Sequence, residues 1–251
     1  MRDQSQAWSE AAASYESEFV DPCRLPGANP LLDALAKLPQ ARGVAADLGC
    51  GVGPMLPLLS RRFKHVHAVD FAPGMLERAR SRNADLPNLD FHQRPLTDLA
   101  PLHGTLAVAV AVNSLVMPEL ADLEKALAEI HASLRPGGRF LGIVPAMDAV
   151  HYHSLLLLDR ARASGLPPEA SRRNAAAHAE HGYFDFAFGG FRYKGIEQHF
   201  WQPFEIGMRL RKAGFRRVRR AKVRLAWEQF ACGAELRHLP PPWDWFFSAR
   251  R

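Results

Sequence analysis

The residues best suited to hold a small ligand lie in one segment, residues 44–53, which reads Val-Ala-Ala-Asp-Leu-Gly-Cys-Gly-Val-Gly. An apolar run containing a single acid, Asp47, leads into glycines at alternate positions, Gly49, Gly51 and Gly53. Glycine adopts backbone angles closed to other residues and lets a ligand lie against the main chain. The leucine-rich segment that begins at Met55 predicts a helix, whose first N–H groups and positive dipole end attract anions. The segment therefore predicts a small-molecule cradle at a strand-to-helix turn.

The spacing of the glycines indicates which molecule the cradle holds. Dinucleotide sites favour Gly-x-Gly-x-x-Gly facing a pyrophosphate, whereas this chain has Gly-x-Gly-x-Gly preceded by an acid that would repel a pyrophosphate and suit an ammonium group. Residues 47–53 resemble the first motif of the class I S-adenosylmethionine-dependent methyltransferases. The Leu-Arg-Pro-Gly-Gly stretch at 134–138, between a predicted helix and a predicted strand, is similar to a second signature of that family. The resemblance implies an enzyme that uses S-adenosylmethionine.

In this family the ligand lies beyond the carboxyl ends of the strands, which assigns further contacts by resemblance. Asp70 ends the second predicted strand and is expected to accept both ribose hydroxyls. Phe71 and Met75 follow and are expected to pack on the adenine, although core packing at the start of a helix explains Met75 equally well. Within the loop, the expected contacts are Asp47, Gly49, Cys50, Gly51 and Gly53.

The remaining expected cofactor contacts are less regular. Pro95 stands where relatives carry an acid that accepts a hydrogen bond from the adenine amino group, so another group must accept that bond here. The Leu96 N–H stays able to donate to the adenine ring. Ala107 stands where relatives often have an acid. Asn113 follows an apolar run and is expected to bind the methionine part of the cofactor, unless it caps a turn. Tyr15 is expected to cover the sulfonium or to pack on the sheet.

The chemistry requires mainly that an acceptor be brought in line with an already activated methyl group. A general base matters when the acceptor is a hydroxyl or an ammonium. His151 and His153 follow the fifth predicted strand and are candidates for that base, with packing or surface positions as the alternative. The following segment is rich in aromatic residues and suggests an apolar or aromatic acceptor, a small molecule. These aromatic residues are Phe184, Phe186, Phe188, Phe191, Tyr193 and Trp201.

Predicted strands and helices alternate along the chain, which indicates a parallel sheet with crossover helices. The predicted strands are 44–48, 65–70, 89–93, 106–112 and 139–144, with a closing pair at 215–227 and 243–249. The predicted helices are 73–83, 122–134, 152–164, 168–181 and 204–213, besides the one beginning at Met55. The predicted fold is α/β and Rossmann-like, with a mostly parallel seven-stranded sheet, helices on both faces and an antiparallel last strand.

We predict four parts along the chain. Residues 1–40 form a helical cap, and 41–150 form the cofactor-binding core. Residues 151–200 are an inserted helical and aromatic lid over the acceptor, and 201–251 return to the core sheet.

Length and composition narrow the class of protein. At 251 residues and 47% hydrophobic, the chain can bury one substantial core. It has no apolar run of about 18 residues, so no membrane span is expected, and its first residues lack the apolar core of a signal peptide. Cys23, Cys50 and Cys232 are odd in number and far apart. They predict no disulfide framework and no metal site, and favour the cytoplasm.

The net charge of +6 is concentrated in the arginine-rich segment 209–224. This segment would suit nucleic-acid phosphates, yet interleaved apolar residues such as Leu210, Phe215 and Val223 equally predict the solvated face of a helix and a strand. We favour the solvated face, so nucleic acid is not the expected partner. An RNA or protein methyltransferase that docks through 209–224, and a cofactor-binding protein without catalysis, remain as alternatives, and the oligomeric state stays open.

Overall fold

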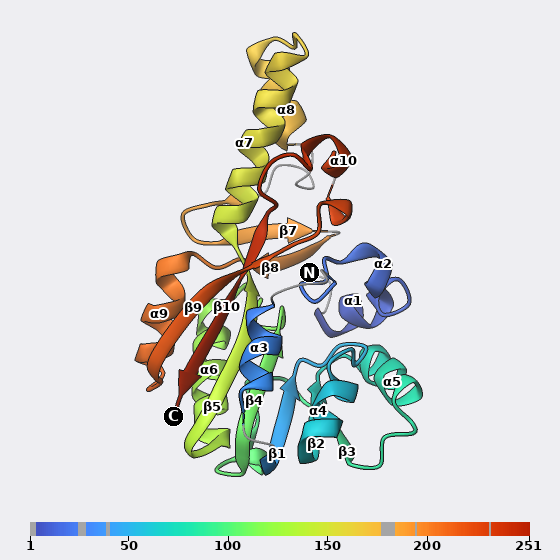
Figure 1. Ribbon diagram of the computed structural model, residues 1–251, viewed down its shortest axis with the longest axis vertical. Helices are drawn as coiled ribbons and strands as arrows, with labels where there is room; N and C mark the ends of the chain where they lie inside the picture. Colours follow the sequence, from blue (N-terminus) through green and yellow to red (C-terminus); the bar gives the residue numbers. More distant parts are fainter. Residues whose placement is uncertain (1–3, 25–28, 39–40, 177–183, 194, 231) are drawn as a thin grey trace.

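A seven-stranded sheet forms the centre of the computed structural model, which describes residues 4–24, 29–38, 41–176, 184–193, 195–230 and 232–251 (Figure 1). The strand order is β3-β2-β1-β4-β5-β10-β9. Neighbours among the first five strands pair in parallel, and β10 pairs antiparallel with both β5 and β9. This confirms the predicted fold. The strands are β1 (Ala41–Leu48), β2 (Phe63–Asp70), β3 (Leu89–Gln93), β4 (Leu106–Val112), β5 (Leu134–Pro145), β9 (Arg216–Arg224) and β10 (Trp243–Arg250).

Helices cover both faces of this sheet because its central strands are apolar on both sides. Along β4, Val108 and Val110 pack on one face, and Ala109 and Ala111 on the other. The first face carries α3 (Pro30–Ala36), α4 (Leu56–Arg62) and α5 (Pro73–Arg82), and the second carries α6 (Leu120–Ser133) and α9 (Pro203–Lys212). Prolines at the first turn begin α3, α5 and α9, where the missing N–H has no intrahelical partner to lose.

Two sequence predictions near β5 need correction. The Pro136-Gly137-Gly138 stretch does not separate helix from strand: β5 already begins at Leu134. Leu106 pairs with Leu134 but Val108 pairs with Arg139, so β5 bulges between these pairs, and Gly137 takes a φ of 76° there. At its other end, β5 leads almost directly into α7 (Met147–Ala163), which therefore starts before the predicted residue 152.

The predicted lid contains helices and a small sheet. Figure 1 shows α7 and α8 (Pro168–Ala176) projecting from the carboxyl end of β5. Beside them lies a three-stranded sheet of β6 (Phe184–Asp185), β7 (Gly190–Tyr193) and β8 (Ile196–His199). Two of the aromatic residues expected near the acceptor, Phe186 and Phe188, lie in the turn after β6 and are 36% and 75% exposed. The rest of the predicted helix 168–181, beyond Ala176, lies outside the described residues.

The two ends of the chain pack around the carboxyl edge of the sheet. Helix α1 (Gln4–Ala11) lies against α5, where the Gly74 N–H donates to Ser9 Oγ at 3.3 Å. Helix α2 (Tyr15–Glu18) follows α1. After β9, which ends at Arg224 rather than at the predicted residue 227, a 3₁₀ turn (Trp227–Gln229) and α10 (Gly233–Leu236) pack against α7. None of the described helices has the length and apolar composition that crossing a bilayer requires.

Candidate functional site

The glycine loop after β1 has the backbone of a ligand cradle. Gly49, Gly51 and Gly53 have φ values of 71°, 54° and 79°, a region that side chains disfavour. A Cβ on Gly49 would lie 2.2 Å from Ser114 Cβ, and one on Gly53 would lie 2.7 Å from Asn83 Nδ2, so these two glycines allow close packing. A Cβ on Gly51 would meet no atom within 4 Å. Gly51 is therefore the position at which the loop faces open space.

Two buried acids flank this open space. Asp47 is 2% exposed, and its Oδ2 has no hydrogen-bond partner within the described part of the chain. Burial, and next the charge of Asp70, raise the pKa of Asp47 to about 7. Asp70 accepts hydrogen bonds from the Gly51 and Ala72 N–H groups, each at 2.9 Å. Burial raises the Asp70 pKa against these donors. A ligand that brings an ammonium to Asp47 and hydroxyls to Asp70 would stabilise both carboxylates.

Helices α1 and α2 pack against the glycine loop. Trp8 and Tyr15 pack with Val52 of the loop and with Met75 of α5. Tyr15 stacks on Phe19 with ring centroids 5.1 Å apart. Burial raises the pKa of Tyr15 to about 12, with further contributions from acids that include Asp70 and Asp47. The charges of both cradle acids therefore act on Tyr15, whereas Met75, 2% exposed, serves the packing of this cluster.

The predicted adenine positions lie at the end of β3. The Arg94 N–H donates to the Asp70 carbonyl at 3.0 Å, which fixes the segment beside β2. Pro95 is exposed, and its carbonyl accepts the Asp98 N–H at 3.1 Å in a turn. The Leu96 side chain is buried in the core. Phe71 follows Asp70 directly and is half-buried, and its carbonyl accepts a hydrogen bond from Ser5 of α1. The structure thus places all of these residues along the same edge of the sheet.

Asn113 directly follows β4 and has a strained conformation, with a φ of 49°. Its Nδ2 donates to Asp244 Oδ2 at 3.0 Å, and its Oδ1 has no partner among the described residues. Asp244, near the start of β10, is 5% exposed. Burial raises the pKa of Asp244 to about 7, although hydrogen bonds from Asn113 and the Ala146 N–H oppose this shift. The structure thus joins a predicted residue to an acid that sequence reasoning missed.

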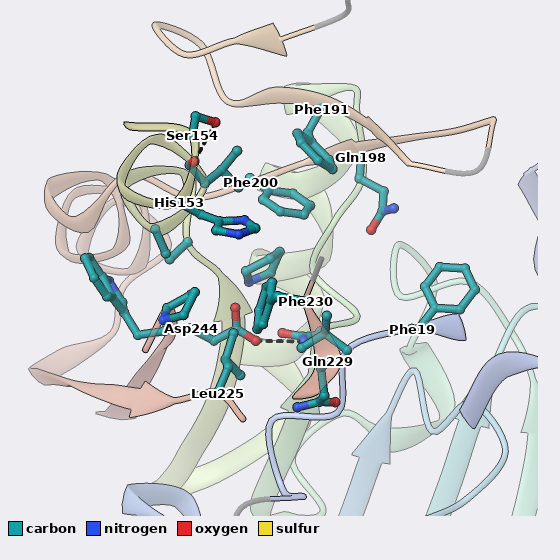
Figure 2. Close-up of a pocket in the computed structure, with 18 of the residues that line it drawn as sticks. Phe19, His153, Ser154, Phe191, Gln198, Phe200, Leu225, Gln229, Phe230 and Asp244 are labelled. Carbon is teal, nitrogen blue, oxygen red and sulfur yellow. Dashed lines mark hydrogen bonds between the residues drawn. The ribbon is translucent and has the colours of Figure 1, made fainter. Parts of the chain in front are cut away.

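A cavity of about 270 Å³ opens beside Asn113 and Asp244. Its walls come from the N-terminal segment, α7, the small sheet and the segment before β10 (Figure 2). Apolar side chains predominate, seven of them aromatic, and none of the lining residues within the described part of the chain is lysine or arginine. Gln229 closes the cavity against the N-terminal segment, because its side chain accepts the Asp21 N–H at 2.8 Å and donates to the Asp21 carbonyl at 3.2 Å. The aromatic lining residues are Trp8, Tyr15, Phe19, Phe191, Phe200, Phe230 and Trp243.

The two candidate histidines are separated by the structure. His153 lines the cavity from α7, facing Asp244 across it in Figure 2, with its ring 5.4 Å from that of Phe230. His151 is exposed, lies 5.1 Å from the Phe186 ring and does not line the cavity. Residues 151 and 153 are two positions apart and therefore lie on different faces of the helix. Of the two histidines predicted as candidates for the general base, only His153 lines the cavity.

Trp201 also departs from the expected acceptor pocket. It is 1% exposed and donates its indole N–H to the Leu115 carbonyl at 2.7 Å, so it stabilises the segment after β4. Of the predicted aromatic insertion, Phe191 lines the cavity, joined by Phe200. The side chains of Phe184 and Tyr193 lie outside what the structure describes.

Comparison with known proteins agrees with this geometry. Residues 45–138 match the family described as methyltransferase domain. A stretch of 97 residues is 41% identical to malonyl-[acyl-carrier protein] O-methyltransferase of Serratia marcescens, covering 38% of this chain and 35% of that protein. The curated relatives are matched over about a third to a half of their length.

Solved structures share the fold over nearly the whole chain. A chain from the complex between the Haloferax volcanii Trm112 methyltransferase activator and a methyltransferase superposes with a TM-score of 0.65 at 19% identity, covering 99% of this chain and 96% of that one. The DhpI–SAH complex superposes with a TM-score of 0.62 at 16% identity, covering 99% and 94%.

The open Gly51 cradle and the paired acids Asp47 and Asp70 lie within the part of the chain that matches the methyltransferase-domain family. This match, together with the shared fold, supports a class I S-adenosylmethionine-dependent methyltransferase. S-adenosylmethionine is its cofactor.

Proposed function

We propose that this protein transfers a methyl group from S-adenosylmethionine to a small, largely apolar acceptor held in the aromatic cavity. The observation that supports this most is that the cradle and the cavity share a wall. Tyr15 and Asn113 both line the cavity. Tyr15 also lies within electrostatic reach of Asp70 and Asp47, and Asn113 directly follows β4, the strand beside β1. An acceptor in the cavity would thus lie next to the cofactor.

The bound cofactor supplies an activated methyl group, and the chain's own residues provide position and surroundings. In the proposed complex, Asp47 would bind the ammonium, Asp70 the ribose hydroxyls, and the N–H groups of the loop the methionine carboxylate. The orphaned Oδ1 of Asn113 is a second acceptor for the ammonium. The aromatic rings of Trp8, Tyr15 and Phe19 exclude water and can face a positive charge.

Asp244 is the group best placed to accept a proton from the acceptor. Its pKa of about 7 allows it to take a proton at neutral pH, as a general base requires. This favours an acceptor with a hydroxyl or amine that must lose a proton on methylation. A carboxylate acceptor is disfavoured, because the described residues that line the cavity include the acid Asp244 and the histidine His153 but neither lysine nor arginine. We therefore do not propose the substrate named for the Serratia relative as the acceptor of this chain.

The basic segment supports a docking function less well. On β9 and its neighbour, Lys222 lies 3.2 Å from the centre of the Trp243 ring and Arg220 lies 5.7 Å from that of Trp245, so these cations pack on the sheet. Other arginines line a groove with α3 that shares no lining residue with the aromatic cavity. Residues of the cradle do not line that groove either.

The free cysteines Cys23, Cys50 and Cys232 accord with a reducing compartment such as the cytoplasm.

The test uses S-adenosylmethionine with a deuterated methyl group, offered with a small-metabolite extract, with total RNA and with total protein in separate reactions. We expect label in small molecules, together with release of S-adenosylhomocysteine. Label found in RNA alone or in protein alone would refute the acceptor class. Calorimetric binding of S-adenosylhomocysteine without any turnover would instead favour the cofactor-binding protein that does not catalyse.

A further inference from the structure

Four metal-ligating side chains gather on one face of the sheet, away from the cradle and the cavity. Val66 and Ala68 of β2 point into the core with α4 and α5, so the alternate residues His65 and His67 face the opposite side. On β3, Asp90 and His92 repeat this spacing. The parallel register sets His67 opposite Asp90 and Val69 opposite His92, which brings the two pairs together.

This face is open because the connection from β3 to β4 contains only a single 3₁₀ turn, Ala100–Leu102, among its described residues. The side chains of His65 and Asp90 are 30% and 58% exposed, so an ion from solvent can reach them. His67 and His92 are half-buried beneath them. The arrangement therefore has an entry path on one side and a fixed floor on the other.

The distances agree with a site for a metal ion. His65 Nε2 lies 2.9 Å from Asp90 Oδ2, and His67 Nδ1 lies 2.9 Å from His92 Nε2. One ligand atom each from His65, His67 and Asp90 lies within 4.8 Å of the other two. Ligand atoms around a tetrahedral zinc ion are about 3.3 Å apart, so small side-chain rotations bring this trio to ligating geometry.

We propose that His65, His67 and Asp90 bind one divalent transition-metal ion of the zinc class, and that His92 orients the His67 ring as its outer hydrogen-bond partner. Two imidazoles and a carboxylate are ligands that suit zinc, copper and nickel better than calcium or magnesium. Outer partners of this kind fix the ring of a ligating histidine. The sequence-based expectation of no metal considered the cysteines and could not see the pairing of these two strands.

The site would fasten the edge strand β3 to β2. The segment that follows β3 is already held to the end of β2, because the Arg94 N–H donates to the Asp70 carbonyl. A metal ion bound by both strands would add a second link between them. Binding to the folded state alone raises stability by mass action. We therefore expect the metal to raise the melting temperature whether or not an acceptor is known.

The test uses the 251-residue chain without an affinity tag, treated with a chelator and titrated with zinc chloride by calorimetry, and with cobalt(II) by absorbance. We expect one equivalent of zinc, a tetrahedral cobalt spectrum and a higher melting temperature. His67→Ala should abolish all three signals. His92→Gln should weaken zinc binding about tenfold to hundredfold, as loss of an outer partner does.

The matched control is His103→Ala, because His103 forms a similar histidine–carboxylate pair with Glu129 at 3.0 Å on the surface. This variant should retain zinc binding. Absence of stoichiometric binding in the wild type, or equal loss in the His103 and His67 variants, would overturn the proposal. Loss in His92→Gln as complete as in His67→Ala would overturn the outer role of His92. Unchanged S-adenosylhomocysteine binding in each variant would show that it folds.

Discussion

Replacing Asp244 by asparagine should stabilise the protein at alkaline pH while removing activity. The pKa of Asp244 is raised from 3.8 to about 7 in the folded chain, chiefly by burial. The folded chain thus binds this proton more tightly than the unfolded chain. The stability that this site supplies is complete below about pH 4, declines as the pH rises to about 7 and stays lost above it.

The shift of about three pKa units corresponds to about 4 kcal/mol, of which about 2 kcal/mol falls between pH 5 and pH 7. Asp244→Asn keeps one acceptor oxygen for Asn113 but carries no charge. Its gain in unfolding free energy over the wild type should therefore be larger at pH 8 than at pH 5, by up to about 3 kcal/mol. Urea denaturation at the two pH values measures this difference.

The same variant should lose about 10²- to 10⁴-fold in turnover, as expected when a general base is removed, with S-adenosylhomocysteine binding retained. Asp98→Asn is the matched control, because Asp98 is an exposed acid paired with Arg94, and it should show neither effect. Equal stabilisation of Asp244→Asn at both pH values would refute the electrostatic reasoning. Retained turnover would refute the catalytic role.

Further variants test the cradle and the cavity. Gly51→Ala should weaken S-adenosylhomocysteine binding about tenfold or more in calorimetry, since its Cβ enters the open space of the cradle. It should keep most of the folding stability, because the backbone strain costs about 1–2 kcal/mol. Gly49→Ala should instead lower the melting temperature. Asp70→Ala should raise the dissociation constant of S-adenosylhomocysteine about 100-fold, from the loss of two charge-assisted hydrogen bonds, and unchanged affinity would contradict the ribose assignment. His153→Ala should lower turnover with a cavity-bound acceptor, whereas His151→Ala should leave it unchanged; the reverse order would place the acceptor elsewhere.

The core of the fold follows from local sequence patterns. The ranges predicted for β3 and β4 match the structure residue for residue, because apolar strands between polar turns are signalled by adjacent residues alone. The family and the cofactor could likewise be predicted from local sequence, because the loop from Asp47 to Gly53 is continuous. The comparisons with known proteins support both predictions. The individual cofactor contacts stay predictions.

The rest of the site depends on contacts that no local pattern records. Asp244 joins Asn113 across 131 positions, and the only local signal was an acid between Trp243 and Trp245 in an otherwise apolar strand. A buried acid in that setting requires a reason, and this could have drawn attention to it. The histidine cluster likewise required the register between β2 and β3, which sequence spacing alone does not provide.

The contact between Gln229 and Asp21 has a consequence for how the protein is made. It joins residues 208 positions apart, and it closes a cavity whose walls come from both ends of the chain. During synthesis, the cofactor half of the sheet emerges from the ribosome long before β10. The acceptor cavity is therefore complete only after the segment that contains Gln229 and Asp244 has been synthesised and has folded against the N-terminal segment.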